Sequence, residues 1–411
     1  MTTATTGARA REAVDGGEVP VRWVWLAAWP VTAVFVLSNA ATPLYVLWQR
    51  ELGFGRGTLT VVFACYIAGL LGSLLVSGVV SDRLGRKPVL LPALGLALVA
   101  CLVFATAGGV GALIAARLCT GVAVGAVVSA GMAAVTDVAG PGRRRLAALL
   151  ASCAMVFGAG VGPLLAGVLS ETLPGPAVTV FAVEAVLLVS AVVVVLRMPA
   201  RGPVRRDAGG GWFRVPGVPR GAGWQLALGI AVFAPGITAT SFVLSLGPSL
   251  LAGLLGTGSR AVSGALAFAM FLCATGVQFA VRRLARRTVL AAGAGATALG
   301  MAALVCAVHT GSVAALAGAA LLAGAGQGMG QLGGLSLLNS AVPGARLAEA
   351  NAAFNVGGYL PAGLLPVSAG YLSDAVGLTA GATVFGTALA GLAVAGGAVV
   401  LLGRRRVTEA G

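Results

Sequence analysis

The sequence predicts an all-α polytopic membrane protein with twelve transmembrane helices in two pseudo-symmetric six-helix bundles. Three observations predict this fold class: 58% of the 411 residues are hydrophobic while only 9% are charged, apolar segments recur along the chain, and the two halves share sequence. A soluble globular protein carries about 25% charged residues, and a disordered chain is poor in apolar residues. Both of those classes are therefore excluded.

Twelve segments have the length and apolar character needed to cross a bilayer, which takes ~20 residues. They are expected at residues 23–47, 59–80, 89–108, 112–135, 146–169, 178–197, 223–247, 260–281, 288–308, 312–339, 349–370 and 379–402. The first segment is too long for the core of a signal peptide. We therefore expect it to remain as a transmembrane helix.

The distribution of basic residues predicts the orientation. The net charge is +15, from 27 Lys and Arg against 12 Asp and Glu, which in a soluble protein would suggest a nucleic-acid partner. With the N-terminus placed inside, only Arg50, Arg56 and Arg260 fall in outer segments. Because cytoplasmic loops collect Lys and Arg, we expect both termini in the cytoplasm, a multi-pass protein of the cell membrane, and no nucleic-acid partner.

The predicted spans divide the chain six from six. We expect a cytoplasmic N-terminal tail at residues 1–22, bundles at 23–197 and 223–402, a cytoplasmic linker at 198–222, and a C-terminal tail at 403–411. The linker is rich in Arg, Gly and Pro, which is typical of a flexible connection.

Two pairs of segments repeat between the halves. Residues 83–87 read RLGRK and residues 283–287 read RLARR; residues 137–142 read DVAGPG and residues 339–344 read NSAVPG. The offsets stay between 200 and 202, and Arg145-Leu-Ala matches Arg346-Leu-Ala in the same register. Such a repeat implies a pseudo-twofold axis along the membrane normal and a cavity between the bundles.

A glycine and charge motif lies between the second and third spans, formed by Gly78, Asp82, Arg83, Gly85, Arg86 and Lys87. It resembles the signature of the major facilitator superfamily. The resemblance implies that Asp82 caps the eleventh helix in the outward-open state, and that Arg86 pairs with an acid ending helix 4, for which Asp137 is the candidate. Glu349 would repel Asp82 unless Arg346 or Arg83 lies between them. The alternative is a charged loop that only sets orientation.

Two further motifs resemble those of the same superfamily. Helix 4 carries Arg117, Gly121 and Gly125, for which the resemblance implies a role near substrate or in proton coupling; the alternative is that Arg117 snorkels to the outer surface. Helix 5 carries a set similar to that of the drug:proton antiporters, although Ala166 replaces a usual glycine. This antiporter-like set, which favours export over import, comprises Gly158, Gly162, Pro163 and Gly167.

Glu184 is the only acid well inside a span, and intramembrane carboxylates are functional candidates by default. We consider Glu184 and Arg117 for proton coupling. The alternatives for Glu184 are an interfacial carboxylate or one paired with Arg117. His309, the only histidine, lies at the outer end of its span and receives no role.

Uncharged polar residues recur on the helices expected to line the cavity. The candidate substrate residues are Asn39, Thr42, Tyr45, Thr238, Gln327, Gln331, Asn351, Asn355 and Tyr359. Hydrogen bonding between helices is the alternative explanation for each of them. The six cysteines show no metal or redox spacing, so we expect no metal site.

These features favour a secondary transporter that works by alternating access and exports a small neutral or amphiphilic, hydrophobic compound in exchange for protons. Uptake of a nutrient or metabolite is the alternative. An enzyme is not expected because the spans carry no catalytic set, and a sensor is not expected because no soluble domain is evident. We expect a monomer in the lipid bilayer, with a small-molecule substrate and protons as partners and no cofactor.

Overall fold

The computed structural model describes residues 19–199, 216–253, 256, 258–343 and 346–403. The helices of the first half are α2 (Val21–Ala40), η1 (Thr42–Leu44), α3 (Tyr45–Leu52), α4 (Arg56–Leu84), α5 (Lys87–Ala105), α6 (Val110–Ala126), η2 (Val127–Gly131), α7 (Met132–Ala139), η3 (Pro141–Arg143), α8 (Arg144–Thr172) and α9 (Pro176–Arg197). Those of the second half are α10 (Gly223–Gly253), α11 (Arg260–Val281), α12 (Arg286–Thr310), α13 (Val313–Ala341), α14 (Leu347–Val376) and α15 (Leu378–Leu402).

These helices form twelve segments of spanning length, because α2 continues through η1 into α3, and α6 continues through the π-helical η2 into α7. Within the described residues, eleven of the segments are long and apolar enough to cross a membrane. The twelfth, α14, has 30 residues but is interrupted by polar residues and two prolines. The all-α fold class and the twelve helices predicted from the sequence are confirmed.

Most helices extend past their predicted ends, although α5 stops at Ala105 and α11 matches its prediction. Helix α4 covers Arg56–Leu84, whereas the sequence predicted residues 59–80. Gly78, Asp82 and Arg83 therefore lie in the last turns of α4, and the prediction of a longer connecting segment there was wrong. Hydropathy underestimates the length of such helices, because helical hydrogen bonding continues into the polar boundary of the membrane, where charged side chains are tolerated.

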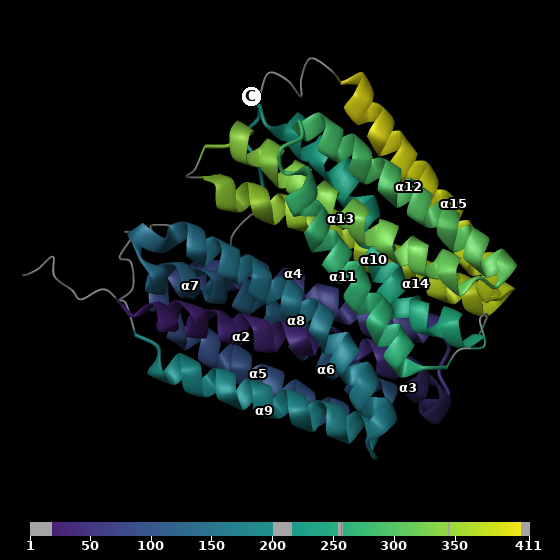
Figure 1. The fold of residues 1–411 in the computed structure, drawn as a ribbon, viewed down its shortest axis with the longest axis horizontal. Coiled ribbons are helices and arrows are strands. Elements are labelled where there is room, and N and C mark those ends of the chain that lie inside the picture. The colour runs from purple at the N-terminus through teal and green to yellow at the C-terminus, as the bar shows by residue number, and fades with distance from the viewer. Residues whose placement is uncertain (1–18, 200–215, 254–255, 257, 344–345, 404–411) are drawn as a thin grey trace, which may run out of the picture.

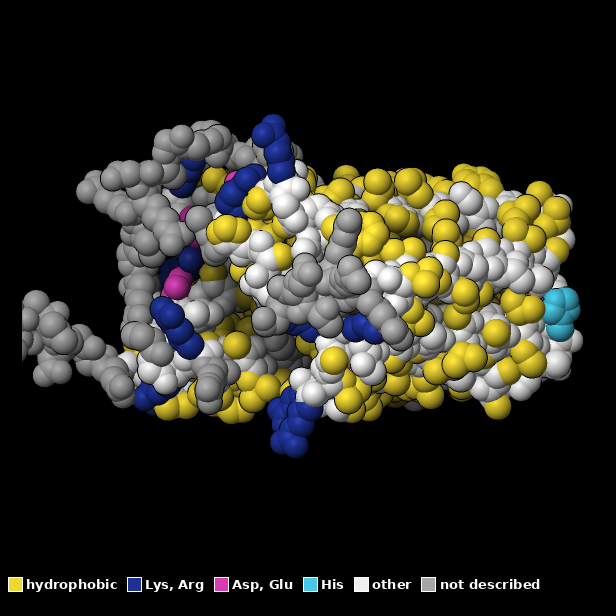
Figure 2. Space-filling view, turned by 90° about the horizontal axis from the view of Figure 1, so that it is seen from above, with side chains coloured by type: hydrophobic (Ala, Val, Ile, Leu, Met, Phe, Trp, Pro, Cys, Tyr) yellow, Lys and Arg dark blue, Asp and Glu magenta, His cyan; other side chains and the backbone are white. Residues whose placement is uncertain are grey.

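Figure 1 shows two helical bundles, one built from α2–α9 and the other from α10–α15. The bundles contact each other mainly through α4 with α14 and α8 with α11. They meet at one end and diverge toward the other (Figure 1). Figure 2 shows Lys and Arg side chains gathered around the end where the bundles diverge, with a hollow there, and the histidine at the far end. We call the first the basic end, where α4 ends at Leu84 and α14 begins at Leu347, and the second the opposite end, where α4 begins at Arg56 and α14 ends at Val376.

Glycines permit close packing within the N-terminal bundle. A Cβ on Gly121 of α6 would overlap the backbone carbonyl of Tyr66 on α4, and one on Gly162 of α8 would overlap the carbonyl of Val36 on α2. Small residues of this kind let helix backbones approach in membranes.

The predicted tails, except residues 19–22 and 403, lie outside the described residues, as do residues 200–215 of the predicted linker. The described end of that linker contacts the C-terminal bundle. The backbone N–H of Gly217 donates to the carbonyl of Glu349, at 3.3 Å, near the start of α14.

Candidate functional site

Arg117 occupies a fully buried position on α6, where its side chain is 0% exposed. Its guanidinium donates to the backbone carbonyl of Ser38, at 2.7 Å. Three aromatic rings surround its Cζ, with centroids at 5.7 Å for Tyr45, 5.2 Å for Phe63 and 5.0 Å for Tyr66. The snorkelling alternative was therefore wrong: the cation is stabilised inside the protein by a carbonyl and by aromatic faces.

The carbonyl of Ser38 is available because α2 ends at Ala40 and gives way to η1, which contains Pro43. The last carbonyls of a helix have no helical donor four residues on. This break also orients Thr42 and Tyr45 toward the interior, where both are almost fully buried.

Several buried polar side-chain atoms of the two bundles have no hydrogen-bond partner among the described residues. In the N-terminal bundle they include Thr42 Oγ1, whereas the Tyr45 hydroxyl interacts with Arg117. In the C-terminal bundle they include Thr238 Oγ1 on α10 and Gln327 Oε1 on α13. Buried polar groups are normally hydrogen-bonded, so these atoms are available to a polar solute or to water.

The other predicted cavity residues fall into different surroundings. Asn39 is buried and donates to the hydroxyl of Ser38, at 3.1 Å. Asn351 and Asn355 line a cavity of about 190 Å³ between α4 and α14, with one buried Asn351 oxygen unpartnered within the described part of the chain. Tyr359 packs edge-on against Phe233, with ring centroids 6.2 Å apart. Gln331 is half-buried on α13.

The signature motif forms an ion-pair network at the basic end. Arg86 donates to Asp137 at 2.8 Å and to Asp82 at 2.7 Å, and also to the hydroxyl of Ser81. Partial burial alone would lower the pKa of Arg86, but its hydrogen bonds with Asp137 and Asp82 outweigh this and raise the pKa above its ordinary value. The structure thus brings together Arg86 and Asp137, which the resemblance linked, and adds Asp82, for which the resemblance implied a contact with the eleventh helix instead.

Gly85 ends α4 with φ of +97°, a conformation that favours glycine, and its N–H donates to the carbonyl of Ser81. The next residue but one, Lys87, donates to the carbonyl of Leu196 at the end of α9, at 2.9 Å. Its counterpart in the repeat, Arg287, donates to the carbonyl of Leu401 at the end of α15, at 2.7 Å. Both cations therefore lie at helix C-termini, where the helix dipole favours positive charge.

Glu349, which the sequence placed as a repulsive neighbour of Asp82, forms an ion pair with Arg346 at 3.0 Å.

Gly125 of the helix 4 motif packs against α4, where a Cβ would meet the side chain of Ser73.

The antiporter-like set on α8 lies where this helix crosses two others. A Cβ on Gly158 would meet the carbonyl of Thr32 on α2, and one on Gly167 would overlap the carbonyl of Arg260 on α11. The carbonyl of Pro163 lies where a Cβ on Gly264 would be. This set therefore provides close backbone packing both within the N-terminal bundle and between the bundles.

Glu184 is buried in the N-terminal bundle, with 1% of its surface exposed. Neither carboxyl oxygen has a hydrogen-bond partner among the described residues, and no ion pair with Arg117 is found there. The two interpretations favoured from the sequence, an interfacial carboxylate and a pair with Arg117, were wrong because α9 turns Glu184 inward toward α5, where Cys101 is an electrostatic neighbour.

With this geometry established, comparison with known proteins identifies the family. Residues 24–287 match the family model described as Major Facilitator Superfamily. The chain belongs to the major facilitator superfamily. This membership places it among membrane transporters rather than enzymes, as the sequence predicted.

Curated relatives within the superfamily match over shorter stretches. The chain is 31% identical to the 3-(3-hydroxy-phenyl)propionate transporter of Escherichia coli over 133 residues, covering 32% of this chain and 31% of that protein. It is 30% identical to an uncharacterized MFS-type transporter of Mycobacterium tuberculosis over 158 residues, covering 36% of this chain and 26% of the other. The matches therefore span about a quarter to a third of these relatives.

Solved structures of superfamily members share the whole fold. The POT family transporter PepTSo aligns with a TM-score of 0.75 at 13% identity, covering 94% of this chain and 98% of that one. A bacterial homologue of the human lysosomal transporter Spinster, described as inward-facing and unoccupied, aligns with a TM-score of 0.74 at 15% identity, covering 96% and 99%. At such identities the likeness concerns the fold alone.

Proposed function

We propose that this chain is a secondary transporter that works by alternating access and exports a small neutral or amphiphilic, hydrophobic compound in exchange for protons. The basic end faces the cytoplasm in this proposal, because Lys and Arg gather there (Figure 2). The divergence of the bundles toward that end then makes the described conformation inward-facing.

The observation that carries the substrate class is the environment of Arg117. This cation is enclosed by the rings of Tyr45, Phe63 and Tyr66 and bonded to a backbone carbonyl. The buried side-chain atoms without a partner among the described residues include hydroxyl and amide oxygens, on Thr42 of this bundle and on Thr238 and Gln327 of the other. Aromatic faces and a few neutral hydrogen-bonding groups suit an amphiphilic compound better than a multiply charged one.

Export is supported by the antiporter-like set on α8, whose glycines lie at the crossings with α2 and α11. Uptake is the second candidate, and one observation favours it: a relative is described as a transporter of 3-(3-hydroxy-phenyl)propionate. Both directions use the same aromatic site, so the substrate class does not depend on the choice between them.

Proton coupling in this proposal uses Glu184, with Arg117 as the second candidate. An ionised carboxylate with no partner in an apolar interior costs several kcal/mol, so Glu184 would have to change its surroundings when it releases a proton. In this proposal the packing of α9 against α5 within the N-terminal bundle differs between the two states of the transporter.

A compound-sensitivity screen tests this proposal. The full chain is expressed in a host that lacks its own exporters, beside Asp82→Asn as an inserted but impaired control. Resistance to hydrophobic or aromatic compounds with the unmodified chain alone would support export, whereas increased sensitivity, or growth on an aromatic compound as a nutrient, would support uptake. Identical growth of the two strains on every compound would contradict both.

A further inference from the structure

Two acids end equivalent helices of the two bundles. The last turns of α8, which ends at Thr172, contain GVLSE at residues 167–171, and those of α14, which ends at Val376, contain GYLSD at residues 370–374. The offset is 203 residues, close to that of the repeats at the basic end. Glu171 and Asp374 are therefore related by the pseudo-twofold axis, and both lie at the opposite end.

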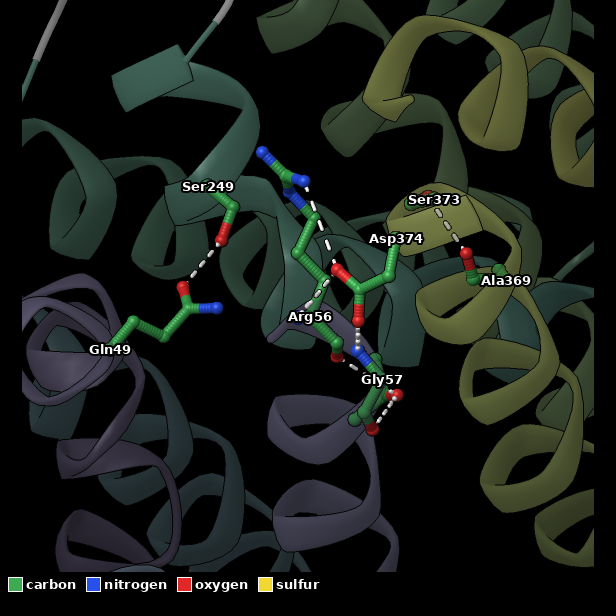
Figure 3. Close-up of polar contacts among 8 residues, drawn as sticks. Gln49, Arg56, Gly57, Ser249, Ala369, Ser373 and Asp374 are labelled. Carbon is green, nitrogen blue, oxygen red and sulfur yellow. Dashed lines mark hydrogen bonds and ion pairs between the residues drawn. The ribbon is translucent and has the colours of Figure 1, made fainter. Parts of the chain in front are cut away.

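Asp374 contacts the start of a helix in the other bundle. Its carboxylate accepts hydrogen bonds from the backbone N–H groups of Arg56 and Gly57, at 2.9 and 2.8 Å, in the first turn of α4 (Figure 3). The Arg56 side chain also approaches the same carboxylate, at 3.8 Å. Beside this contact the Ser249 hydroxyl of α10 donates to the side-chain oxygen of Gln49 on α3, at 3.0 Å (Figure 3).

Glu171 repeats this arrangement with the bundles exchanged. Its carboxylate accepts a hydrogen bond from the backbone N–H of Arg260, at 2.5 Å, where α11 begins. The Arg260 side chain donates to the carbonyl of Ser170, at 2.6 Å. Arg260 lies 204 residues after Arg56, an offset one residue longer than that between Glu171 and Asp374, so both members of the contact recur between the halves.

Small residues bring each carboxylate within reach. A Cβ on Gly57 would lie 2.5 Å from the ring of Tyr371, and one on Gly370 would overlap the hydroxyl of Thr60. Gly167, the equivalent of Gly370, meets the backbone of Arg260 in the same way. Both contacts, α14 with α4 and α8 with α11, therefore allow the end of one helix to approach the start of the other directly.

The physical basis of the contact is the unsatisfied N–H groups at a helix start, which carry partial positive charge and favour an anion. Hydrogen bonds to an ionised acceptor are also stronger than neutral ones. The side chains of Arg56 and Asp374 are about one-third exposed, so each contact is of a strength that a conformational change can reverse.

We propose that Asp374 and Glu171 form a pair of symmetric latches that close the opposite end of the molecule while the basic end is open. Each latch is a carboxylate at the end of one helix capping the start of a helix in the other bundle. The proposal rests on alternating access but not on any substrate or on proton coupling.

The resemblance implies that Asp82 caps the eleventh helix when the basic end is closed. The two latches would act in the alternative state, in which the opposite end is closed. Helices α4 and α14 run in opposite directions, so the last turn of α4 and the first turn of α14 lie at the basic end, while the first turn of α4 meets Asp374 at the opposite end. In the described conformation Asp82 binds Arg86. Release of Asp374 from α4 and engagement of Asp82 with α14 would then be alternative states of one helix pair.

Hydrogen–deuterium exchange of the full chain in lipid nanodiscs tests this, without added substrate. Asp374→Asn and Glu171→Gln should each speed exchange about threefold to fivefold at the helix start that the acid caps, residues 56–60 or 260–264. Each should also slow exchange at residues 347–356, because a population with the basic end closed increases. The double variant should show the larger change, and Asp374→Glu should restore the unmodified pattern.

Glu51→Gln is the matched control, since Glu51 is exposed at the same end and makes no hydrogen bond or ion pair that the structure shows in its described part. Faster exchange at the capped helix starts without any change at residues 347–356 would mean that each acid stabilises only the helix start that it caps. That result would overturn the proposal. The same pattern in Glu51→Gln would also overturn it. Because no transport is measured, failure here is distinct from failure of the proposed export.

Discussion

Arg117 and Ser38 join the fourth transmembrane segment to the end of the first helix, through a hydrogen bond of 2.7 Å to a backbone carbonyl. The bond uses a carbonyl that the break at η1 leaves without a helical donor. The position of this buried cation therefore depends on a break in another helix, and substitutions at Arg117 should directly disturb this contact between α6 and α2.

Replacing Arg117 should impair transport. Arg117→Ala removes the cation, and Arg117→Lys keeps the charge but loses the planar group that stacks against aromatic rings. We expect each to lower the transport rate about tenfold or more, which corresponds to ~1.4 kcal/mol. Transport into membrane vesicles measures this, with Arg50→Ala, an exposed arginine at the opposite end, as the control that should keep its rate. Full activity of Arg117→Lys would show that only the charge matters.

Replacing Asp82 should reduce transport while membrane insertion remains intact. In the conformation described here Asp82 forms an i,i+4 pair with Arg86 and is half-exposed, and such pairs add little stability. Its importance is expected in the state where the basic end closes. Asp82→Asn should therefore insert normally and transport several-fold more slowly.

The control for Asp82→Asn is Glu349→Gln, which breaks an exposed ion pair at the same end. Surface pairs contribute about 0–1 kcal/mol, so this variant should transport at nearly the normal rate. Equal losses in both variants would indicate a general charge effect at the basic end and would remove the special role of Asp82.

Replacing Glu184 should change the pH dependence of transport. The carboxyl group is buried with no hydrogen-bond partner among the described residues, and Glu184→Gln keeps its shape without a titratable proton. If this residue couples transport to protons, the variant should lose most of the response of its rate to pH between about 5 and 8. An unaltered pH profile would exclude Glu184 as the coupling site and leave Arg117 as the candidate.

Replacing Gly121 should destabilise the fold. A Cβ there would overlap the Tyr66 carbonyl, whereas Gly111 on the same helix has open space within 4 Å. Overpacking of this kind costs about 1–3 kcal/mol. Gly121→Ala should lower the thermal unfolding temperature in detergent while Gly111→Ala leaves it unchanged. Equal unfolding temperatures would mean that α4 and α6 can separate without cost.

The sequence was most informative where a physical constraint acts locally. Apolar length predicted the twelve helices, and the resemblance to the superfamily signature implied that Arg86 pairs with Asp137, which lies at 2.8 Å in the structure. The sequence was less informative about which way a side chain on a transmembrane helix points. Glu184 looked interfacial from its distance to the helix end, but which side of α9 faces α5 depends on packing between helices.

The sequence did not predict residues whose role depends on the approach of another helix. Phe63 and Tyr66 are ordinary aromatic residues of α4 in the sequence, and only the approach of α6 places their rings around Arg117. The acids at the opposite end did carry a signal, the repeat of GVLSE and GYLSD. That signal is easily overlooked because acids at the ends of spans are common.

The most direct test of the account is transport into everted membrane vesicles, whose interior corresponds to the cell exterior. With an inward-acid proton gradient, an amphiphilic aromatic compound that scores in the sensitivity screen should accumulate inside vesicles containing the full chain. Accumulation should collapse with a protonophore and be several-fold lower with Asp82→Asn. Accumulation that is identical with and without the chain, or that persists after the gradient is removed, would contradict proton-coupled export by alternating access.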